Sequence, residues 1–316
     1  MLKKIVLTSA LLFATAASAA YPERPVKIIV SNPPGGPVDV MLRVLAIKLG
    51  AAWGQPVVVE NKPGASGIIS TNALAKSAPD GYTLGMTVAS ALTILPFAID
   101  KMPYDPQKDL QPVTLVARTP FVFVVAKDSP IKNWQDFVQQ AKKRELSIGS
   151  YSIGTAFHLV WEQTARRAGI KALYVPSPSA GKTQNDVVGG LIDVALDAPS
   201  SSKGMIDGGR LRALAITSPQ RFSGLPDVPT LDESGMPGYA PQPWIGMMAP
   251  AGVPADRIAF LQREVARVLK DPEMITQMAT LGMIPVGSST AELAATITKD
   301  RQEMEPLIKE LGIKVE

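Results

Sequence analysis

Small, glycine-rich segments that follow short apolar runs point to one chemical possibility in this chain, the binding of an anion. The first spans residues 26–43, where the β-branched run VKIIV precedes PPGGP (residues 33–37) and Asp39. PPGGP excludes both strand and helix, so we predict a buried strand, a glycine turn, and a helix that begins at Asp39. This order directs free backbone N–H groups at an anion, although an ordinary strand-to-helix connection carries the same residue types.

The same design recurs along the chain. Five predicted strand ends carry small, polar or glycine-rich loops, at residues 34–37, 64–67, 89–91, 152–155 and 177–179, and a sixth carries Asp197. In open α/β sheets, ligands lie beyond the carboxyl ends of the strands. These loops contain almost no cations, so helix dipoles and hydrogen bonds would hold a carboxylate. Asp39 and Asp197 could pair as carboxylates, but the simpler interpretation is that Asp39 caps its helix and Asp197 orders a loop or a water molecule.

Residues that enzymes use are scarce. The chain has no cysteine, no G-x-S-x-G motif and no dinucleotide-binding G-x-G-x-x-G after a predicted strand. Its one histidine, His158, lies in an apolar predicted helix, where a structural role is favoured over that of a base. Two matches to the acyl-transfer pattern S-x-x-K, at residues 179–182 and 200–203, are short enough to arise by chance. We therefore expect no catalytic residues, no metal site and no cofactor.

Residues 1–19 have the character of a secretory signal peptide. Lys3 and Lys4 form a basic start, residues 5–13 are largely apolar, and residues 17–19 (ASA) fit a cleavage site. We expect cleavage after Ala19 and export to the periplasm, with a retained N-terminal anchor as the alternative. Loss of the two lysines lowers the formal net charge from +4 to +2, which is too small and too dispersed to favour nucleic acid.

Predicted strands and amphipathic helices alternate over a length that suits two domains. Residues 113–126, interrupted at Pro120, are expected to cross from a first to a second domain, and residues 244–249 to form the second crossing strand. Helices at 254–270, 272–281 and 290–311 then close the chain against the first domain. The prediction is an α/β fold of two doubly wound domains facing a cleft. Domain 1 would comprise residues 20–120 and 226–316, and domain 2 residues 121–225.

Eight blocks, met in order from Tyr21 to the C-terminus, resemble the Bug-type solute-binding proteins, the periplasmic receptors of tripartite tricarboxylate transporters. They are YPERPVKIIV-x-x-PPGGPVDV, GQPVVVENKPGASG, APDGYTL, MPYDPQKDLQPVTLVA, GGLIDVALDAPSS, LRALAITSPQR, LPDVPTLDESGMPGY and APAGVP. The resemblance implies a type II periplasmic-binding-protein fold, whose two domains are joined by a hinge and close on a small organic acid. It also implies membrane permease subunits as partners.

The resemblance also assigns site residues. Two loops of the family hold one carboxylate through backbone groups and waters, and they match Gly35, Gly36, Pro37 and Asp39, and Ala65, Ser66 and Gly67. Positions matching Ser90, Ser152, Thr155 and Asp197 contribute the rest of the pocket.

The chain departs from the family pattern at three places. Ser31-Asn32 replaces Pro-Phe, Ala156-Phe157 replaces Ser-Ser, and Ser177-Pro178-Ser179 replaces Tyr-Lys-Gly. Asn32, Ala156 and Ser177 therefore join the candidate ligand-binding residues. We expect one carboxylate to remain anchored, while the distal group of the ligand and the closure of the hinge differ.

The leading prediction is a monomeric receptor that captures a small organic acid and delivers it to a transporter permease. A sensor that presents its closed form to a signalling partner is the alternative. A periplasmic hydrolase is disfavoured by the missing catalytic motifs. The changed second-domain loops are also compatible with a receptor that no longer binds a ligand.

Overall fold

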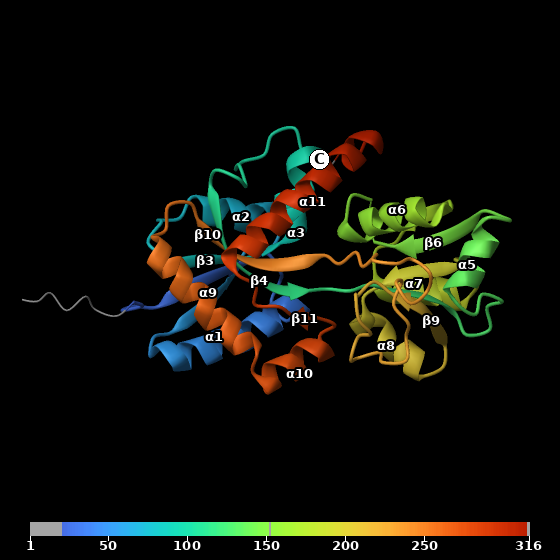
Figure 1. Ribbon diagram of the computed structural model, residues 1–316, viewed down its shortest axis with the longest axis horizontal. Helices are drawn as coiled ribbons and strands as arrows, with labels where there is room; N and C mark the ends of the chain where they lie inside the picture. The colour runs from blue at the N-terminus through green and yellow to red at the C-terminus, as the bar shows by residue number, and fades with distance from the viewer. Residues whose placement is uncertain (1–20, 152, 315–316) are drawn as a thin grey trace, which may run out of the picture.

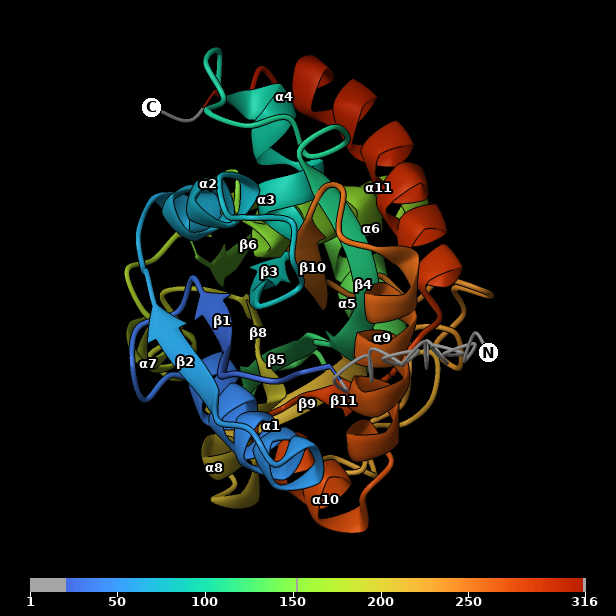
Figure 2. The same cartoon turned by 90° about the vertical axis from the view of Figure 1, so that its left-hand side faces the viewer.

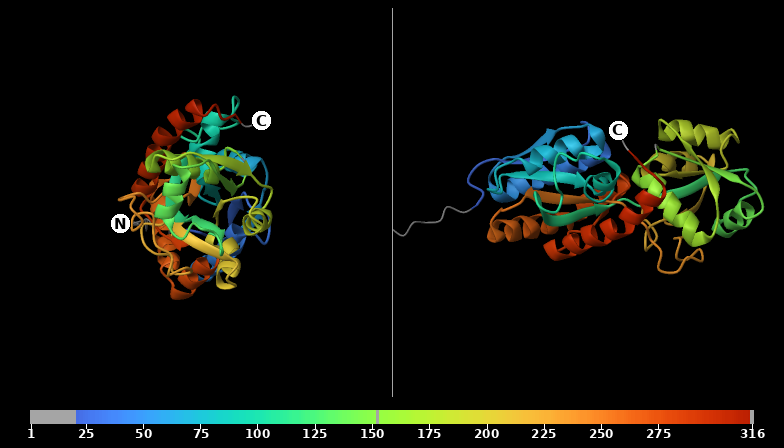
Figure 3. Two further views of the ribbon diagram at one scale, coloured as in Figure 1. Left: turned by 90° about the vertical axis from the view of Figure 1, so that its right-hand side faces the viewer. Right: turned by 90° about the horizontal axis from the view of Figure 1, so that it is seen from above.

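Two β-sheets lie in separate lobes, side by side along the long axis of the protein (Figure 1; Figure 3). The computed structural model describes residues 21–151 and 153–314, and the predicted signal peptide and Ser152 lie outside them. The first sheet contains β1 (Val26–Val30), β2 (Val57–Asn61), β3 (Thr83–Val88), β4 (Leu110–Arg118), β10 (Trp244–Pro250) and β11 (Ile284–Pro285). The second contains β5 (Val122–Ala126), β6 (Leu146–Ser150), β7 (Ala172–Pro176), β8 (Val194–Asp197) and β9 (Leu211–Ile216). The predicted two-domain α/β architecture is confirmed.

Both sheets are mixed, and each has a parallel group of three neighbouring strands. The first sheet has the order β11-β4-β10-β3-β1-β2, in which β1 pairs in parallel with β2 and β3. The second has the order β7-β6-β8-β5-β9, in which β6 pairs in parallel with β7 and β8. The remaining strand pairs are antiparallel. Such groups require helical crossovers, which place helices on both faces of each sheet.

Helices cover both faces of the first sheet, as Figure 2 shows. Its helices are α1 (Pro37–Trp53), α2 (Ile68–Ala75), α3 (Ala89–Thr93), α4 (Leu95–Ala98), α9 (Ala255–Leu269), α10 (Pro272–Thr280) and α11 (Thr290–Glu310). Alternate residues of β10 enter two cores. Ile245 and Met247 pack with α1, α9 and α10, whereas Trp244 and Met248 pack with α2, α3 and α11. The alternation of side chains along a strand explains this division.

The second sheet is covered in the same way. Its helices are α5 (Trp134–Ala141), α6 (Ala156–Ala168), α7 (Ala180–Val188) and α8 (Pro199–Asp207). Trp134 and Trp161, from α5 and α6, fill one core, and Val187 of α7 belongs to the core on the other face. No helix among the described residues has the length and apolar character that crossing a membrane requires.

The chain crosses between the lobes twice. Residues 119–121 join β4 to β5, so the predicted break at Pro120 is confirmed, and residues 217–243 join β9 to β10. In the second crossing, Val228, Leu231 and Met236 pack with the cores of the second lobe. The domain boundaries at 120/121 and 225/226 stay predictions, and this packing favours a later second boundary.

Several expectations about local structure were wrong. The helix predicted from Asp39 begins at Pro37, because proline is tolerated at the first helical position, where no intrahelical acceptor exists for an N–H. Residues 89–91, expected as a loop, start helix α3. Helices α4 and α8 and the two-residue strand β11 were not predicted, since they are short or carry few apolar residues.

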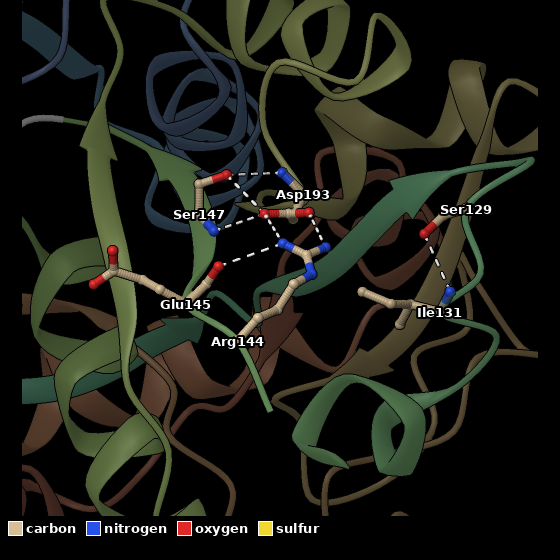
Figure 4. Close-up of polar contacts among 6 residues, drawn as sticks. All are labelled: Ser129, Ile131, Arg144, Glu145, Ser147 and Asp193. Atoms are coloured by element: carbon tan, nitrogen blue, oxygen red, sulfur yellow. Dashed lines mark hydrogen bonds and ion pairs between the residues drawn. The ribbon is translucent and has the colours of Figure 1, made fainter. Parts of the chain in front are cut away.

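A polar cluster fastens the ends of β6 and β8 that lie opposite their carboxyl ends (Figure 4). Asp193 Oδ2 accepts hydrogen bonds from the backbone N–H and the hydroxyl of Ser147, at 2.8 and 3.1 Å. Arg144 reaches the same carboxylate at 2.6 Å. Burial would raise the pKa of Asp193, but the Arg144 guanidinium and the Ser147 donors lower it. This cluster fixes the register of two strands whose other ends approach the first lobe.

Gly149 of β6 provides a test of the packing in the second lobe. A Cβ there would lie 2.8 Å from Thr183 Cγ2 and 2.9 Å from Ile192 Cδ1. We expect Gly149→Ala to lower the free energy of unfolding by about 1–3 kcal/mol through overpacking, measured by urea denaturation. Gly181→Ala is the control, because a Cβ at Gly181 meets nothing within 4 Å. Equal stability of the two variants would contradict the close packing of β6.

Candidate functional site

Three loops meet at one edge of each sheet. Since β2, β1 and β3 are parallel neighbours, their carboxyl ends at Asn61, Val30 and Val88 lie together. In the second sheet, the ends of β7, β6 and β8, at Pro176, Ser150 and Asp197, lie together for the same reason. The predicted site residues follow these six ends, so the structure gathers them into two sets, one in each lobe.

Asp39 connects the loops of the first lobe. Its side chain is 2% exposed and lies 2.9 Å from the guanidinium of Arg43, one turn along α1. Oδ2 also accepts from the backbone N–H of Gly35 at 2.9 Å, and Oδ1 accepts from Asn61 Nδ2 at 2.7 Å. Asn61 Nδ2 also donates a hydrogen bond to the carbonyl oxygen of Asn32, at 2.9 Å. Asp39 therefore orders the loop at residues 31–37 and ties it to β2.

The Asp39 carboxylate is held in its charged form. Burial would raise its pKa, but hydrogen bonds from Arg43, Asn61 and the Gly35 N–H lower the pKa to about 2. A carboxylate that is charged at neutral pH and whose oxygens already accept three hydrogen bonds does not attract a second carboxylate. Asp39 is thus suited to positioning the loop. The expectation that it caps its helix was wrong, because the N-cap of α1 is Gly36 and the helix has no side-chain cap.

The loop between β2 and α2 has backbone angles that residues other than glycine rarely adopt. Ala65 and Ser66 have φ angles of 45° and 50°, and Gly64 and Gly67 have φ angles of 125° and 98°. A Cβ on Gly67 would lie 3.4–3.5 Å from Val88, Ala91 and Ser31, which places this loop against both neighbouring strand ends. Strained backbone of this kind is often retained for function, and consecutive N–H groups in such turns form concave anion-binding sites.

The first-lobe helices begin without a side-chain cap. Gly36 and Gly67 are the N-cap residues of α1 and α2, and glycine has no side-chain oxygen to accept from the first N–H groups. Ser90 is the second residue of α3, whose N-terminus lies beside Gly67. Pro37 is the first residue of α1, and Ala65 and Ser66 lie in the turn that precedes α2. These N-termini can therefore donate to an external acceptor.

Asp197 is the centre of the second-lobe set. Its carboxylate is 2% exposed and accepts from Gln184 Nε2 at 2.7 Å, Ser202 Oγ at 2.8 Å and the Ala198 N–H at 2.7 Å. Burial raises the pKa of Asp197, and these three hydrogen bonds offset the rise only in part. Asp197 connects β8 to α7 and α8, as the interpretation that it orders a loop predicted.

The loop after β6 is held by two aromatic residues. Tyr174 Oη donates to the carbonyl of Tyr151 at 2.7 Å, and the N–H of Gly154 donates to His158 Nδ1 at 3.3 Å. His158 is 7% exposed, and burial lowers its pKa, which keeps the ring neutral. The structural role expected for His158 fits these contacts. Ser152, a candidate ligand residue in this loop, lies outside the described residues.

The other second-lobe candidates follow their strands closely. Thr155 is the N-cap of α6 and accepts from the His158 N–H at 3.5 Å, and Ala156 is the first helical residue. Ser177 is 8% exposed and donates its hydroxyl to the carbonyl of Ser179 at 3.2 Å. Ser177 therefore braces its loop, whereas Ala156 lines a groove.

A groove of about 1030 Å³ separates the lobes beside α6 and α11. Ala89 of the first lobe and Ala156 of the second both line it, so it adjoins the two sets of loops. Most of its lining comes from α6, α11 and residues 238–243, and Ala156 is the one candidate residue among them. We place the candidate site at the strand ends, because the uncapped helices and the strained turn are there and not along the groove.

Metal binding has little support in this arrangement. In residues 21–151 and 153–314, no group of three or more His, Cys, Asp or Glu side chains is placed to hold a metal ion. In α6, Arg167 donates to the carbonyl of Pro237. Other basic residues of the candidate loops and of the helices that follow them are paired with acids. Their partners lie within 3 Å in Arg43–Asp39, Lys62–Glu60, Lys182–Asp186 and Lys203–Asp207.

Several site residues could not be selected from the sequence. Arg43, Asn61, Gln184 and Ser202 hold the two buried carboxylates, yet sheet pairing or helix packing brings most of them to the site. Asn61 had the clearest signal, because it ends a strand that begins with the apolar run VVV at residues 57–59. Tyr151 was also missed, although it directly follows β6.

Comparison with known proteins identifies relatives of this chain. The family described as "Tripartite tricarboxylate transporter family receptor" matches residues 41–313. The structure of the periplasmic binding protein BugD is similar, with 32% sequence identity and a TM-score of 0.72, covering 93% of this chain and 99% of that protein.

Two further solved structures contain acids. An R. palustris protein solved with adipate has 29% sequence identity and a TM-score of 0.76, and the match covers 93% of this chain and 99% of the R. palustris chain. MatC of Rhodopseudomonas palustris, solved with bound malate, has 27% sequence identity and a TM-score of 0.71, and the match covers 91% of this chain and 100% of the MatC chain.

The Asp39 cluster makes stability depend on pH. The pKa of Asp39 is about 2, below its ordinary value of 3.8, so its contribution is present above about pH 4 and is lost as the pH falls towards 2. We expect Asp39→Asn to lower the free energy of unfolding at pH 7 by about 1–2 kcal/mol, allowing for solvent around the half-exposed Arg43.

Urea denaturation of the wild type and Asp39→Asn at pH 7, 4 and 2.5 measures this difference, which should shrink at the lowest pH. Asp256→Asn, an exposed first-turn residue of α9, is the matched control. A loss that is constant over this pH range would show that charge on Asp39 is not the cause.

Proposed function

The chain belongs to the tripartite tricarboxylate transporter receptor family, and from this premise we propose that it captures a small organic acid and delivers it to membrane permease subunits. The malate and adipate in the related structures support a carboxylate as the ligand. Transport is favoured over signalling because the family is defined by a transporter.

One observation carries the choice of ligand: the two glycine-capped helix N-termini of the first lobe. Gly36 and Gly67 place no side-chain cap on α1 and α2, and the strained turn at Ala65 and Ser66 directly precedes α2. Since Pro37 has no N–H and the Ile68 N–H donates to the Ala65 carbonyl, the donors to a ligand would be the later N–H groups of each first turn. An anion at this position receives hydrogen bonds from backbone donors together with the dipoles of two helices. We propose that Gly35, Gly36, Pro37, Ala65, Ser66, Gly67 and Ser90 surround the carboxylate, with Asn32 and Asp39 supporting the loop.

The second lobe completes the pocket in this proposal. Ser152, Thr155, Ala156, Ser177 and Asp197 follow the strand ends that approach the first lobe. The lobes would close as rigid bodies about residues 119–121 and 217–243, with the ligand bridging them. Micromolar affinity requires about 8 kcal/mol, which several charge-assisted hydrogen bonds in a closed cleft can supply.

We place the protein in the periplasm as a monomer, exported by a cleavable signal peptide, in keeping with the periplasmic relative BugD. It would act as a binding protein and not as an enzyme. The contacts of the two candidate bases support this view, because His158 Nδ1 accepts from the Gly154 N–H and the buried Asp197 carboxylate accepts from Gln184, Ser202 and the Ala198 N–H.

A ligand screen tests the proposal. We expect a panel of mono-, di- and tricarboxylates to contain an acid that stabilises residues 20–316 by about 2.7 kcal/mol at one hundred times its dissociation constant, read by thermal shift. Gly36→Val should weaken that acid at least tenfold in calorimetry. Gly36 has an extended backbone, and its Cβ would meet only the Pro33 carbonyl oxygen at 3.4 Å, so valine fits the fold but covers the helix end.

Gly204→Val is the matched control, because a Cβ at Gly204 in α8 meets nothing within 4 Å. It should leave affinity within threefold of the wild type. Failure of every acid to bind folded protein free of co-purified ligand would overturn the receptor proposal.

Processing of the N-terminus is a separate prediction. Expression with export should yield a mature protein that begins at Ala20, because residues 17–19 (ASA) present small residues at the cleavage site. Intact-mass spectrometry of the periplasmic fraction measures this. Ala19→Arg should block cleavage and retain the precursor, whereas an unprocessed wild-type protein in the membrane fraction would indicate the N-terminal anchor.

A further inference from the structure

We propose that the groove beside α6 and α11 binds a second ligand, a small oxyanion that carries its own hydrogen-bond donor, between Arg118 at the end of β4 and Asp300 of α11. Hydrogen phosphate and short hydroxy acids have this chemistry. The site is separate from the glycine-rich loops of the first lobe, and the inference does not rest on the proposed function.

Strand pairing directs the Arg118 side chain towards α11. Arg118 lies opposite Trp244, the first residue of β10, in an antiparallel pair. Side chains of residues that lie opposite each other point to the same face of a sheet. On that face Trp244 packs with α2, α3 and α11, and its Nε1 donates to Asp300 Oδ2 at 2.6 Å. Arg118 and Asp300 accordingly line the same groove.

Arg118 has a charge that the fold does not use. Within residues 21–151 and 153–314, this partly buried arginine makes no hydrogen bond, ion pair or ring contact. Every other arginine in that part of the chain has at least one such partner. A guanidinium presents a planar fork of donors that matches two oxygens of a carboxylate or a phosphate. Arg118 can therefore hold an oxyanion.

The Asp300 carboxylate lies near Arg118 but does not pair with it. Burial raises the pKa of Asp300, and the hydrogen bond from Trp244 and the charge of Arg118 offset part of the rise. No nitrogen of Arg118 lies within 4 Å of that carboxylate. In the described part of the chain, Trp244 is the one hydrogen-bond donor to Asp300. A ligand between the two side chains must therefore present an acceptor to Arg118 and a donor to Asp300.

Two amides of the same groove add hydrogen-bonding groups. Gln163 of α6 and Gln242 of the second crossing both line it, and neither side chain has a hydrogen-bond partner among the described residues. The Nε2 atom of Gln242 is buried, where an amide without a partner is costly. A half-turn of this terminal amide exchanges its nitrogen and oxygen, which allows the N–H groups to face a ligand.

The other charged residues of the groove already have partners. Arg166 pairs with Glu310 at 2.8 Å, and Lys299 with Glu303 at 3.8 Å. Arg167 donates to the carbonyl of Pro237. Arg118 and Asp300 are therefore the charged groups best placed to select the ligand.

The order of the strands separates this site from the glycine-rich loops. Ile245 lies opposite both Val88 and Ala117, so Arg118 is level with the end of β3. β4 lies two strands from β3 and three from β1 in the sheet. At about 4.8 Å between neighbouring strands, these distances are roughly 10 and 14 Å. A small oxyanion at Arg118 therefore does not reach the helix ends beyond β1 and β2.

Calorimetric titration of residues 20–316 with inorganic phosphate, sulfate, glycolate and acetate at pH 7 tests the inference. Phosphate and glycolate carry an O–H group, whereas sulfate and acetate carry only acceptors. We expect phosphate to bind at least tenfold more tightly than sulfate, or glycolate at least tenfold more tightly than acetate, because Asp300 accepts from the O–H and repels the ion that lacks it. The tighter of phosphate and glycolate identifies the ligand as an inorganic ion or a hydroxy acid.

Variants then locate the site. Arg118→Gln should weaken the tighter ligand at least tenfold. Arg263→Gln is the matched control, since Arg263 is an exposed arginine of α9 that pairs with Glu264. Asp300→Asn keeps an acceptor for Trp244 but removes the negative charge, so the tighter ligand and its counterpart without the O–H should bind within threefold of each other. This loss of selectivity keeps the test decisive if Arg118→Gln folds poorly.

The same titrations in Gly36→Val separate the groove from the helix ends of the first lobe. Affinity for the tighter ligand should stay within threefold of the wild type. Loss of binding in Gly36→Val, with binding retained in Arg118→Gln, would place the anion at the helix ends and overturn the inference. Binding of neither phosphate nor glycolate, or equal binding within both pairs of ions, would also overturn it. None of these outcomes decides the receptor proposal, which has its own ligand screen.

Discussion

The buried carboxylate of Asp39 is the interaction on which the binding end of the first lobe depends. It accepts hydrogen bonds from its own loop through Gly35, from its own helix through Arg43 and from the next strand through Asn61. A negative charge directly beneath the proposed anion site would repel the ligand if it were left alone. Arg43 offsets that charge, and the three donors use the carboxylate oxygens internally. The loop is therefore ordered before ligand arrives, which lowers the entropy cost of binding.

The two lobes share one architecture but differ in chemistry at the same topological position. Glycine at the N-caps of α1 and α2 offers no side-chain acceptor, whereas Thr155 and Ser179 accept from the third N–H of α6 and α7. Helix α8 of the second lobe, with Ala198 at its N-cap, lacks a side-chain cap as the first-lobe helices do. The difference follows from single residue types, since a hydroxyl side chain at the N-cap reaches the third N–H and glycine cannot. The loops of the first lobe are therefore rich in glycine, whereas those of the second lobe carry hydroxyl groups and the Asp197 carboxylate.

Much of this fold is readable from the sequence, because strand runs such as Val26–Val30 and the break at Pro120 carry strong local signals. The failures are equally local. Pro37 was taken as a helix breaker although it starts a helix, and α8 (PSSSKGMID) has too few apolar residues to show a helical period. Site partners were harder to find. Asn61 and Gln184 reach Asp39 and Asp197 through strand pairing and helix packing, which no motif records.

The contacts between the lobes bear on how easily the cleft could open and close. The lobes touch at two flanks: Arg166 of α6 pairs with Glu310 of α11 at 2.8 Å, and Gly282 lies against Ser200 of α8 (Figure 1). A Cβ at Gly282 would lie 3.1–3.3 Å from Ser200, so glycine allows this approach. The ion pair is exposed, and such pairs contribute about 0–1 kcal/mol. Beside the ion pair, Leu159 of α6 packs in a buried apolar cluster with Leu307 and Ile308 of α11, so a change in the angle between the lobes must keep or rearrange this packing as well.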